Sequence, residues 1–523
     1  MQKWRSLRED FAASIEPKFR AMSSANRKTL QGTVARYVTD FLLAFQCAIM
    51  AFVYAALSYL FPIFWYVSLG LTFLACIYIL VSGKDGLSKS SWIFLMIVSF
   101  GCGYIILILA DRRICCRSDK RRFNAIYARC ARYTPEYPAI NAVTPVLNDC
   151  EYFYKAGGFL PYKNTRVRYF NMAAPLFNDM LIKMEEAKEF IFIEFFTFAD
   201  GMLLERFISV LKRKVAQGVR VCLIYDDAGC QGVLSRATKK RIADAGIEIK
   251  VFQRMLSLFS FGLNIRDHRK IVVIDGKVGY AGGCNVADKY ANLIRLQAIW
   301  KDAGIRLEGE GVDGLTLMFL RQWEFVSRQR VDFGEYTGRY DRFESPHIVL
   351  PYAGGADLSE SVCRDAYINI ISGANERVYI MTPYFIPGQE LYQLIKNKAL
   401  SGVDVRLILP TVPDWKFIYR VSKLNAEGLV KSGVKVYYVR NTFVHSKVIL
   451  TENAAIVGSV NMDMRSFNMQ YDNAVYSDDP ALMEDILADI NDVTSANEVS
   501  DGEQLNFFQK AVATVLKVVS PLM

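Results

Sequence analysis

The chain has 523 residues, which is long enough for two or three domains. Its apolar content of 52% and its mean hydropathy of +0.14 exceed the values of ordinary soluble proteins, which argues against a purely soluble chain. The eleven cysteines are an odd number without a regular spacing, which argues against a disulfide-stabilised secreted domain and favours a reducing compartment.

The N-terminal part of the chain combines a basic segment, residues 1–40, with an apolar region, residues 41–111. Three uncharged runs in this region have about the length that crosses a bilayer: Phe41–Phe61, Phe64–Val81 and Trp92–Ala110. No periodic polar face interrupts them, so we expect transmembrane helices here. A cleavable signal peptide is not expected, because the first apolar run begins only after some forty residues.

Basic residues flank the apolar region on both sides. Arg27, Lys28 and Arg36 precede it. A larger basic cluster follows it: Arg112, Arg113, Arg117, Lys120, Arg121 and Arg122. The positive-inside rule places both flanks in the cytoplasm, which three complete crossings cannot satisfy, so the number of crossings stays open. We expect the basic flanks to be attracted to anionic lipid headgroups.

The remaining sequence reads as a connector (residues 112–160), two α/β halves (161–345 and 346–500) and an amphipathic tail (501–523). Helices and strands alternate in both halves, which predicts a duplicated α/β unit with mixed sheets covered by helices. The predicted helices are Leu176–Ala187, Leu203–Gln217 and Glu390–Leu400, and the predicted strands are Phe190–Phe196, Val219–Tyr225, Arg377–Met381 and Val403–Leu409.

Only three histidines occur in the chain, and two of them begin the same short pattern. Each is followed by Lys two positions later, by an acidic residue, and then by a glycine-containing turn and an Asn. The first copy contains His268, Lys270, Asp275 and Asn285, and the second contains His445, Lys447, Glu452, Ser459 and Asn461. This repetition predicts one bipartite site that handles phosphate and transfers it through a histidine.

The spacing of the pattern has a physical interpretation. Residues i and i+2 of a strand face the same side, so His-x-Lys directs an imidazole and an ammonium group into one space. The β-branched runs Ile271–Ile274 and Val448–Leu450 are typical of buried strands. The turns that follow let Asn285 and Asn461 return to the site. Two lysines and two asparagines can hold a phosphodiester, and imidazole suits both nucleophilic attack and proton transfer.

At these residues the sequence resembles the phospholipase D superfamily, whose signature is His-x-Lys-x4-Asp followed by Gly-Gly/Ser-x-Asn, present twice. Within that superfamily it is most similar to bacterial cardiolipin synthases, over nearly the whole chain. One departure is Glu452, which stands where the family has Asp. The stretches that carry the resemblance are His268–Lys277, Trp300–Asp302, Thr382–Pro387, Gly458–Phe467 and Ser520–Met523.

The resemblance implies two repeated phospholipase D-like α/β/α domains with mixed sheets, preceded by a helical transmembrane region. It also implies that both histidines meet at a pseudo-twofold interface. The implied reaction is a phosphatidyl transfer in the membrane that makes cardiolipin and glycerol from two phosphatidylglycerol molecules through a phosphohistidine. By resemblance His268 is the nucleophile and His445 the acid, although the sequence alone does not assign these roles.

The other candidate site residues fall into three groups. Lys270, Asp275, Lys447 and Glu452 complete the catalytic set, Asn285, Asn461 and Ser459 are candidates for phosphate binding, and Asp302 and Asp472 for orienting the histidines. No metal motif or nucleotide-binding fingerprint occurs in the sequence, so we expect no cofactor and no metal. Lysines and backbone dipoles would then stabilise the transferred phosphoryl group.

The expected partners are phosphatidylglycerol and other anionic membrane lipids. Nucleic acid is disfavoured because a membrane anchor confines the site to the bilayer surface. The expected location is the bacterial cell membrane, with several crossings and a cytoplasmic catalytic region. A hydrolytic phospholipase D, another phosphatidyltransferase and a non-enzymatic membrane scaffold remain as alternatives, and the oligomeric state stays open.

Overall fold

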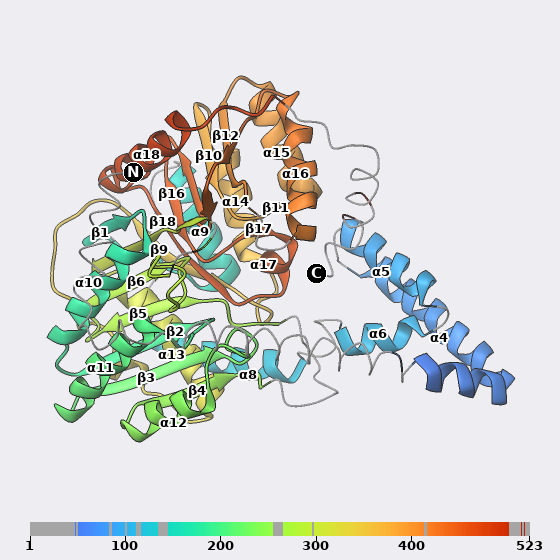
Figure 1. Ribbon diagram of the computed structural model, residues 1–523, viewed down its shortest axis with the longest axis horizontal. Helices are drawn as coiled ribbons and strands as arrows, with labels where there is room; N and C mark the ends of the chain where they lie inside the picture. Colours follow the sequence, from blue (N-terminus) through green and yellow to red (C-terminus); the bar gives the residue numbers. More distant parts are fainter. Residues whose placement is uncertain are drawn as a thin grey trace.

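The computed structural model describes residues 48, 51–82, 86–99, 102–110, 117–133, 145–254, 265–294, 296, 298–412, 416–501, 514 and 517. Two seven-stranded mixed sheets form the main body, and helices cover both of them (Figure 1). This arrangement confirms the predicted fold class of two repeated α/β domains.

The first sheet lies within residues 165–309. Its strands are β1 Thr165–Phe170, β2 Phe190–Phe195, β3 Arg220–Asp226, β4 Glu248–Phe252, β5 Lys270–Ile274, β6 Val278–Gly282 and β8 Gly304–Gly309. They follow the order β1-β8-β6-β5-β2-β3-β4, in which β2, β3 and β4 are parallel and the others add antiparallel. The central strands are continuous apolar runs because both faces of the sheet are covered.

The second sheet repeats this order within residues 349–477. Its strands are β9 Val349–Gly354, β10 Arg377–Met381, β12 Asp404–Pro410, β13 Lys435–Val439, β15 Val448–Thr451, β16 Ala455–Gly458 and β18 Asp472–Ser477. Read in the same direction as the first sheet, the order is β9-β18-β16-β15-β10-β12-β13. The strand that follows each His-x-Lys motif, β5 or β15, therefore occupies the same central place in its sheet.

Helices pack on the faces of both sheets. In the first domain they are α10 Ala173–Glu186, α11 Met202–Ala216, α12 Arg236–Asp244 and α13 Val312–Ser327. In the second domain they are α14 Val362–Ser372, α15 Gly388–Leu400, α16 Lys416–Val430, α17 Met464–Asn468 and α18 Pro480–Ser495. Two short 3-10 turns are η1 Ala131–Tyr133 and η2 Phe333–Glu335. Helix α13 is buried on nearly all sides, since it packs against β5 and β6 of one domain and β9 of the other. The hydrophobic core around it is shared by the two domains.

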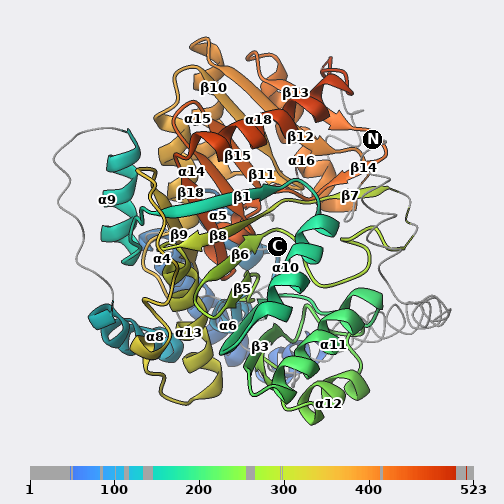
Figure 2. The same cartoon turned by 90° about the vertical axis from the view of Figure 1, so that its left-hand side faces the viewer.

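Short strands join the two domains at their junction. β7 (Ile299–Lys301) of the first domain pairs in parallel with β14 (Thr442–Val444) of the second, and the two lie side by side in Figure 2. Asp267 and Tyr471 form a parallel bridge between the domains. Within the second domain, β11 (Phe385–Ile386) pairs with β17 (Met462–Asp463). The junction therefore has a parallel contact beside each histidine.

The expected connector, residues 112–160, is largely part of the packed body where the structure describes it. Helix α8 (Arg117–Cys130) buries one face against α13, because Phe123, Ile126 and Cys130 recur at helical spacing. The Phe123 ring lies 4.0 Å from the Phe325 ring and 5.5 Å from the Tyr471 ring, measured between centroids. Helix α8 thus contacts both domains.

Helix α9 (Pro145–Gly157) packs on the second domain. The Phe153 ring lies 4.6 Å from the Tyr352 ring, and Tyr476 donates a hydrogen bond to Asp149 over 2.9 Å. The helical parts of the expected connector therefore belong to the packed body, because their apolar residues complete the core.

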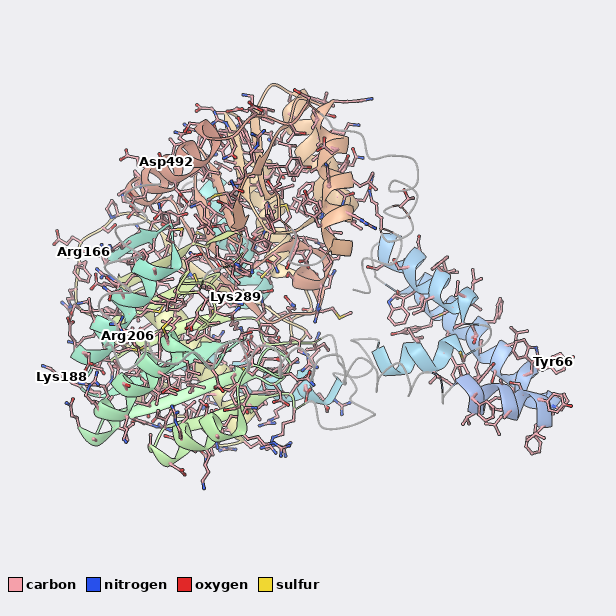
Figure 3. The ribbon with its side chains drawn as sticks, viewed as in Figure 1. Tyr66, Arg166, Lys188, Arg206, Lys289 and Asp492 are labelled. Atoms are coloured by element: carbon pink, nitrogen blue, oxygen red, sulfur yellow. The ribbon has the colours of Figure 1, made fainter. Side chains whose placement is uncertain are left out.

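Where the structure describes it, the apolar N-terminal region forms helices that stand beside the main body (Figure 1). Helix α4 (Pro62–Val81) is long and apolar enough to cross a membrane. Its side chains are largely exposed, including Phe73 at 66% and Leu74 at 60%, and Tyr66 points away from the body in Figure 3. By length and composition it is the one such helix in the described part of the chain.

The predicted third span, Trp92–Ala110, is divided between two helices, α5 (Gly86–Val98) and α6 (Gly103–Ala110). At 1.5 Å per residue neither reaches across a hydrocarbon core of roughly 30 Å, so a single continuous span at this place was wrong. Of the first predicted run, the structure describes a short apolar helix, Ala51–Leu60. The basic segment 1–40 and most of the tail 501–523 lie outside the described residues.

The packing of α8 predicts a strong effect of Phe123→Ala on stability. The side chain is 1% exposed, so its removal leaves a cavity and should lower the free energy of unfolding by about 3–5 kcal/mol. Thermal unfolding of the purified protein measures this effect. Asn124→Ala on the exposed face of the same helix is the control and should change stability by less than about 0.5 kcal/mol. Equal melting temperatures for the two variants would show that α8 is only a tether.

Candidate active site

The two histidines stand at similar places, just before the central strands of the two sheets. His268 precedes β5 by two residues, and His445 precedes β15 by three. The backbone N–H of His268 donates to the carbonyl of Tyr471 over 2.7 Å, and that of His445 donates to the carbonyl of Lys301 over 2.7 Å. Each histidine backbone is thus fixed by the other domain. Both side chains are buried at the junction.

The imidazole rings are oriented by carboxylates that also come from the other domain. His268 Nδ1 lies 2.8 Å from Asp472 Oδ1, and His445 Nδ1 lies 2.5 Å from Asp302 Oδ2. Both aspartates are fully buried. A carboxylate at this distance fixes the proton on Nδ1, so Nε2 of each ring is the nitrogen with a free lone pair. The structure therefore brings together the histidines and the acids proposed to orient them, in a crossed arrangement.

The two lysines fold back onto the histidine segments. Lys270 Nζ donates to the carbonyl of His268 over 2.5 Å, and Lys447 Nζ donates to the carbonyl of His445. Lys447 Nζ is also 2.8 Å from His445 Nδ1. One ring nitrogen cannot donate to Asp302 and accept from an ammonium group at once, so we assign the Nδ1 proton to the shorter carboxylate contact.

Burial and mutual charge shift the pKa values of all four basic groups. Burial lowers the pKa of His268 to about 4, Lys270 and Lys447 add to the shift, and Asp472 opposes it. Burial likewise lowers the pKa of His445 to about 3, with Lys447 and Lys270 adding and Asp302 opposing. Because each lysine acts on the histidine of both domains, the four groups form one electrostatic cluster.

The same burial makes the lysines weaker bases. It lowers the pKa of Lys270 to about 7 and that of Lys447 to about 8, although the neighbouring aspartates oppose the shift. At neutral pH the site therefore holds two neutral imidazoles and lysines close to their titration range. An anionic phosphodiester would be attracted to this cluster and would favour its protonated forms.

Aromatic rings surround the two histidines unequally. His268 has Phe196 at 5.2 Å between ring centroids. His445 is enclosed by three rings, Tyr290 at 5.3 Å, Trp300 at 5.4 Å and Phe443 at 5.9 Å. These rings exclude water from the imidazole, which strengthens the electrostatic interactions of the site.

The three residues expected to bind phosphate differ in their surroundings. Asn285 accepts a hydrogen bond from the Thr197 N–H and donates to the Tyr290 hydroxyl, so its amide is engaged by the protein. Asn461 is buried, and its Oδ1 has no hydrogen-bond partner among the described residues. Of the two asparagines, Asn461 is therefore the better placed to bind a ligand, because its Oδ1 is not engaged by the described protein groups.

The expectation that Ser459 binds phosphate needs correction. Its hydroxyl is fully buried and donates to Asp472 Oδ1 over 2.6 Å. The equivalent position in the first repeat is Gly283, where a Cβ atom would collide with Asp302. Ser459 therefore supports the acid that orients His268, and the two half-sites differ at this point.

Asp275 and Glu452 also need correction, because the structure places them at the far ends of β5 and β15 from the histidines. Asp275 accepts hydrogen bonds from the backbone N–H groups of residues 188, 189 and 190. Glu452 accepts from those of Asn375 and Arg377. Each carboxylate therefore holds the loop that leads into the neighbouring strand, and neither reaches the site.

Sequence reasoning missed the supports behind the histidines. Asn473 accepts a hydrogen bond from the Lys270 N–H over 3.0 Å, and Gln322 of α13 donates to Asp267 over 3.1 Å. A buried ion pair of 2.6 Å joins Lys301 to Asp489 of α18. Asn473, Lys301 and Asp267 are adjacent to candidate site residues in the sequence, whereas nothing in the sequence marks Gln322 or Asp489. Within the described residues, no group of three or more His, Cys, Asp or Glu side chains could hold a metal ion.

Comparisons with known proteins agree with this geometry. The family described as cardiolipin synthase, PLD-like domain, matches residues 180–297 and 367–493. Cardiolipin synthase 1 of Staphylococcus aureus is 33% identical over 374 residues, which cover 70% of this chain and 75% of that protein. The cardiolipin synthase of Listeria monocytogenes is 30% identical over 450 residues, which cover 79% of this chain and 90% of that protein.

A solved structure shares the fold. The crystal structure of phosphatidylserine synthase from Haemophilus influenzae superposes with a TM-score of 0.55 at 13% identity, over 73% of this chain and 100% of that chain. From the duplicated sheets, the crossed His–Asp pairs and relatives of this coverage, we conclude that the chain belongs to the cardiolipin synthase family of phospholipase D-like enzymes.

Proposed function

We propose that this protein joins two phosphatidylglycerol molecules into cardiolipin and releases glycerol. The observation that carries the proposal is the buried junction at which each domain supplies one His-Lys pair and the other supplies the acid that orients the histidine. The relatives named cardiolipin synthase and the apolar helix α4 support lipid substrates. The products are a diphosphatidyl lipid and a free alcohol, which a two-step displacement on phosphorus yields.

In the first step, Nε2 of His268 attacks the phosphorus atom of the donor lipid. A phosphorus–nitrogen bond forms while the bond from phosphorus to the glycerol oxygen breaks. His445 supplies the proton that this oxygen needs, because the bound phosphodiester favours protonation of the imidazole beside it. Glycerol leaves, and a phosphatidyl group remains on His268.

In the second step, His445 accepts the proton of an incoming hydroxyl group. The oxygen attacks phosphorus, and the electron pair of the phosphorus–nitrogen bond returns to His268. Lys270, Lys447 and Asn461 balance the charge on the non-bridging oxygens during both displacements. Each imidazole keeps its orientation throughout, since Asp472 and Asp302 hold the Nδ1 protons.

We further propose a location in the bacterial cell membrane, with the catalytic body on the cytoplasmic side. Helix α4 supports a membrane anchor, and additional crossings remain part of the proposal. All eight cysteines that the structure describes are free, as suits a reducing compartment. A membrane location gives the site access to both lipid substrates.

The assigned roles of the histidines predict opposite results for two variants. Phosphatidyl-p-nitrophenol has a leaving group that needs no proton, so His445→Ala should still release a burst of about one equivalent of p-nitrophenolate and then stall. His268→Ala should show no burst. With phosphatidylglycerol both variants should lose about a thousand-fold of the rate of cardiolipin formation.

The third histidine provides the control for this experiment. His347 is about one-third exposed and lies away from the site, so His347→Ala should retain the wild-type rate. A burst from His268→Ala but none from His445→Ala would exchange the two roles. Wild-type protein that yields phosphatidic acid alone from phosphatidylglycerol vesicles would refute cardiolipin synthesis.

The shifted pKa values predict the pH profile of kcat/KM. Attack requires neutral His268, whose pKa is about 4, so the rate should not fall as the pH decreases through 6.5. In the free enzyme the protons of the site reside on Lys270 and Lys447, so kcat/KM should fall as the pH rises through about 7 to 8. Initial rates on phosphatidylglycerol between pH 5 and 9 measure this. An acid limb near pH 6.5 with a flat alkaline side would contradict the electrostatics of the site.

A further inference from the structure

The acceptor lipid poses a requirement that the catalytic groups do not meet. Phosphatidylglycerol carries its own phosphate, separated from the reacting terminal hydroxyl by the three carbons of the glycerol headgroup. During the second step Lys270 and Lys447 are occupied by the phosphoryl group on His268. A second cation beside His445, which handles the incoming hydroxyl, is therefore needed to offset the charge of the acceptor phosphate.

Lys289 stands at this place. Its Nζ lies 4.3 Å from the centroid of the Trp300 ring and 5.3 Å from that of the Tyr290 ring. These are two of the three rings that enclose His445, at 5.4 and 5.3 Å. The Trp300 and Tyr290 rings thus contact both the Lys289 ammonium group and the His445 imidazole. Figure 3 places Lys289 between the two domains.

The loop that carries Lys289 is held firmly. The neighbouring Asp288 accepts hydrogen bonds from the backbone N–H groups of Met202 and Leu203, at 3.0 and 2.8 Å. Asn292 accepts from the Trp300 N–H and donates to the Trp300 carbonyl, both over 2.8 Å. The lysine and the rings beneath it therefore form one platform, and a half-buried charge on such a platform is a well-placed phosphate ligand.

We propose that Lys289 binds the phosphate of the acceptor phospholipid and thereby favours a lipid alcohol over water or glycerol. This inference rests on the proposed function and adds a substrate subsite to it. The acceptor hydroxyl gives its proton to His445 Nε2, its oxygen bonds to phosphorus, and the phosphorus–nitrogen bond to His268 breaks. Lys289 takes no part in these bond changes, since it only holds the acceptor.

The second repeat has a cation at the matching position, which provides a comparison. Lys289 follows Asn285 by four residues, and Arg465 follows Asn461 by four. The charge of Arg465 acts on Arg266, two residues before His268, so Arg465 lies on the side of the nucleophile. The acceptor enters where glycerol leaves, beside His445, which assigns the subsite to Lys289 and not to Arg465.

The experiment compares two reactions of the same phosphatidyl-enzyme. Full-length protein in phosphatidylglycerol vesicles makes cardiolipin with a lipid acceptor, and it exchanges radiolabelled glycerol into phosphatidylglycerol with an uncharged acceptor. Lys289→Met keeps a straight apolar chain over Trp300 and Tyr290 but removes the charge. Cardiolipin formation should fall about tenfold while glycerol exchange stays within about twofold, as the loss of a charge-assisted hydrogen bond implies.

Three further variants complete the test. Lys289→Arg keeps the charge and should retain the wild-type ratio of cardiolipin formation to glycerol exchange. Lys277→Met removes an exposed charge at the far end of β5 and should leave this ratio unchanged. Arg465→Met should also leave the ratio unchanged. An unchanged ratio in Lys289→Met, whether both rates persist or both fall equally, would overturn the inference. Wild-type protein that exchanges glycerol but forms no cardiolipin would instead refute the proposed function.

Discussion

The catalytic arrangement depends on the crossed hydrogen bonds between the two domains. Each imidazole is held by a buried carboxylate of the other domain, and each histidine N–H donates to the carbonyl of the residue just before that carboxylate. The docking of the domains and the orientation of the catalytic nitrogens are therefore one constraint. Helix α13 is buried on nearly all sides between the sheets, so hydrophobic packing around it stabilises this docking.

Burial is the second determinant of the chemistry. The exclusion of water that lowers the pKa of both histidines also lowers that of both lysines, so before substrate binds the site carries less positive charge than its composition indicates. An anionic substrate reverses this tendency when it binds. The half-sites are not equivalent. The Ser459 hydroxyl donates to Asp472, whereas Asp302 lies so close to Gly283 that no side chain fits there, and three rings enclose His445.

Local spacing was sufficient to predict helices α10, α11 and α15 and strands β2, β3, β5, β10, β12 and β15. It was misleading for Asp275 and Glu452, which belong to the same motif but lie seven residues beyond the histidines, roughly 20 Å away along a strand. The partners of these carboxylates are backbone groups on another strand, which no pattern reveals. The pairing of Asp302 with His445 and of Asp472 with His268 likewise depends on tertiary structure. Apolar content alone did not show that α5 and α6 are separate helices or that α8 completes the core.

The crossed pairing has a consequence for how such a fold can operate. A single half contains a histidine and an acid that belong to different His–Asp pairs, so it could complete both pairs only by meeting another half turned about a twofold axis. Covalent linkage of the two halves converts this encounter into an intramolecular one, with an effective concentration that dilution cannot reduce. The pairing of the two halves is therefore independent of the concentration of the protein.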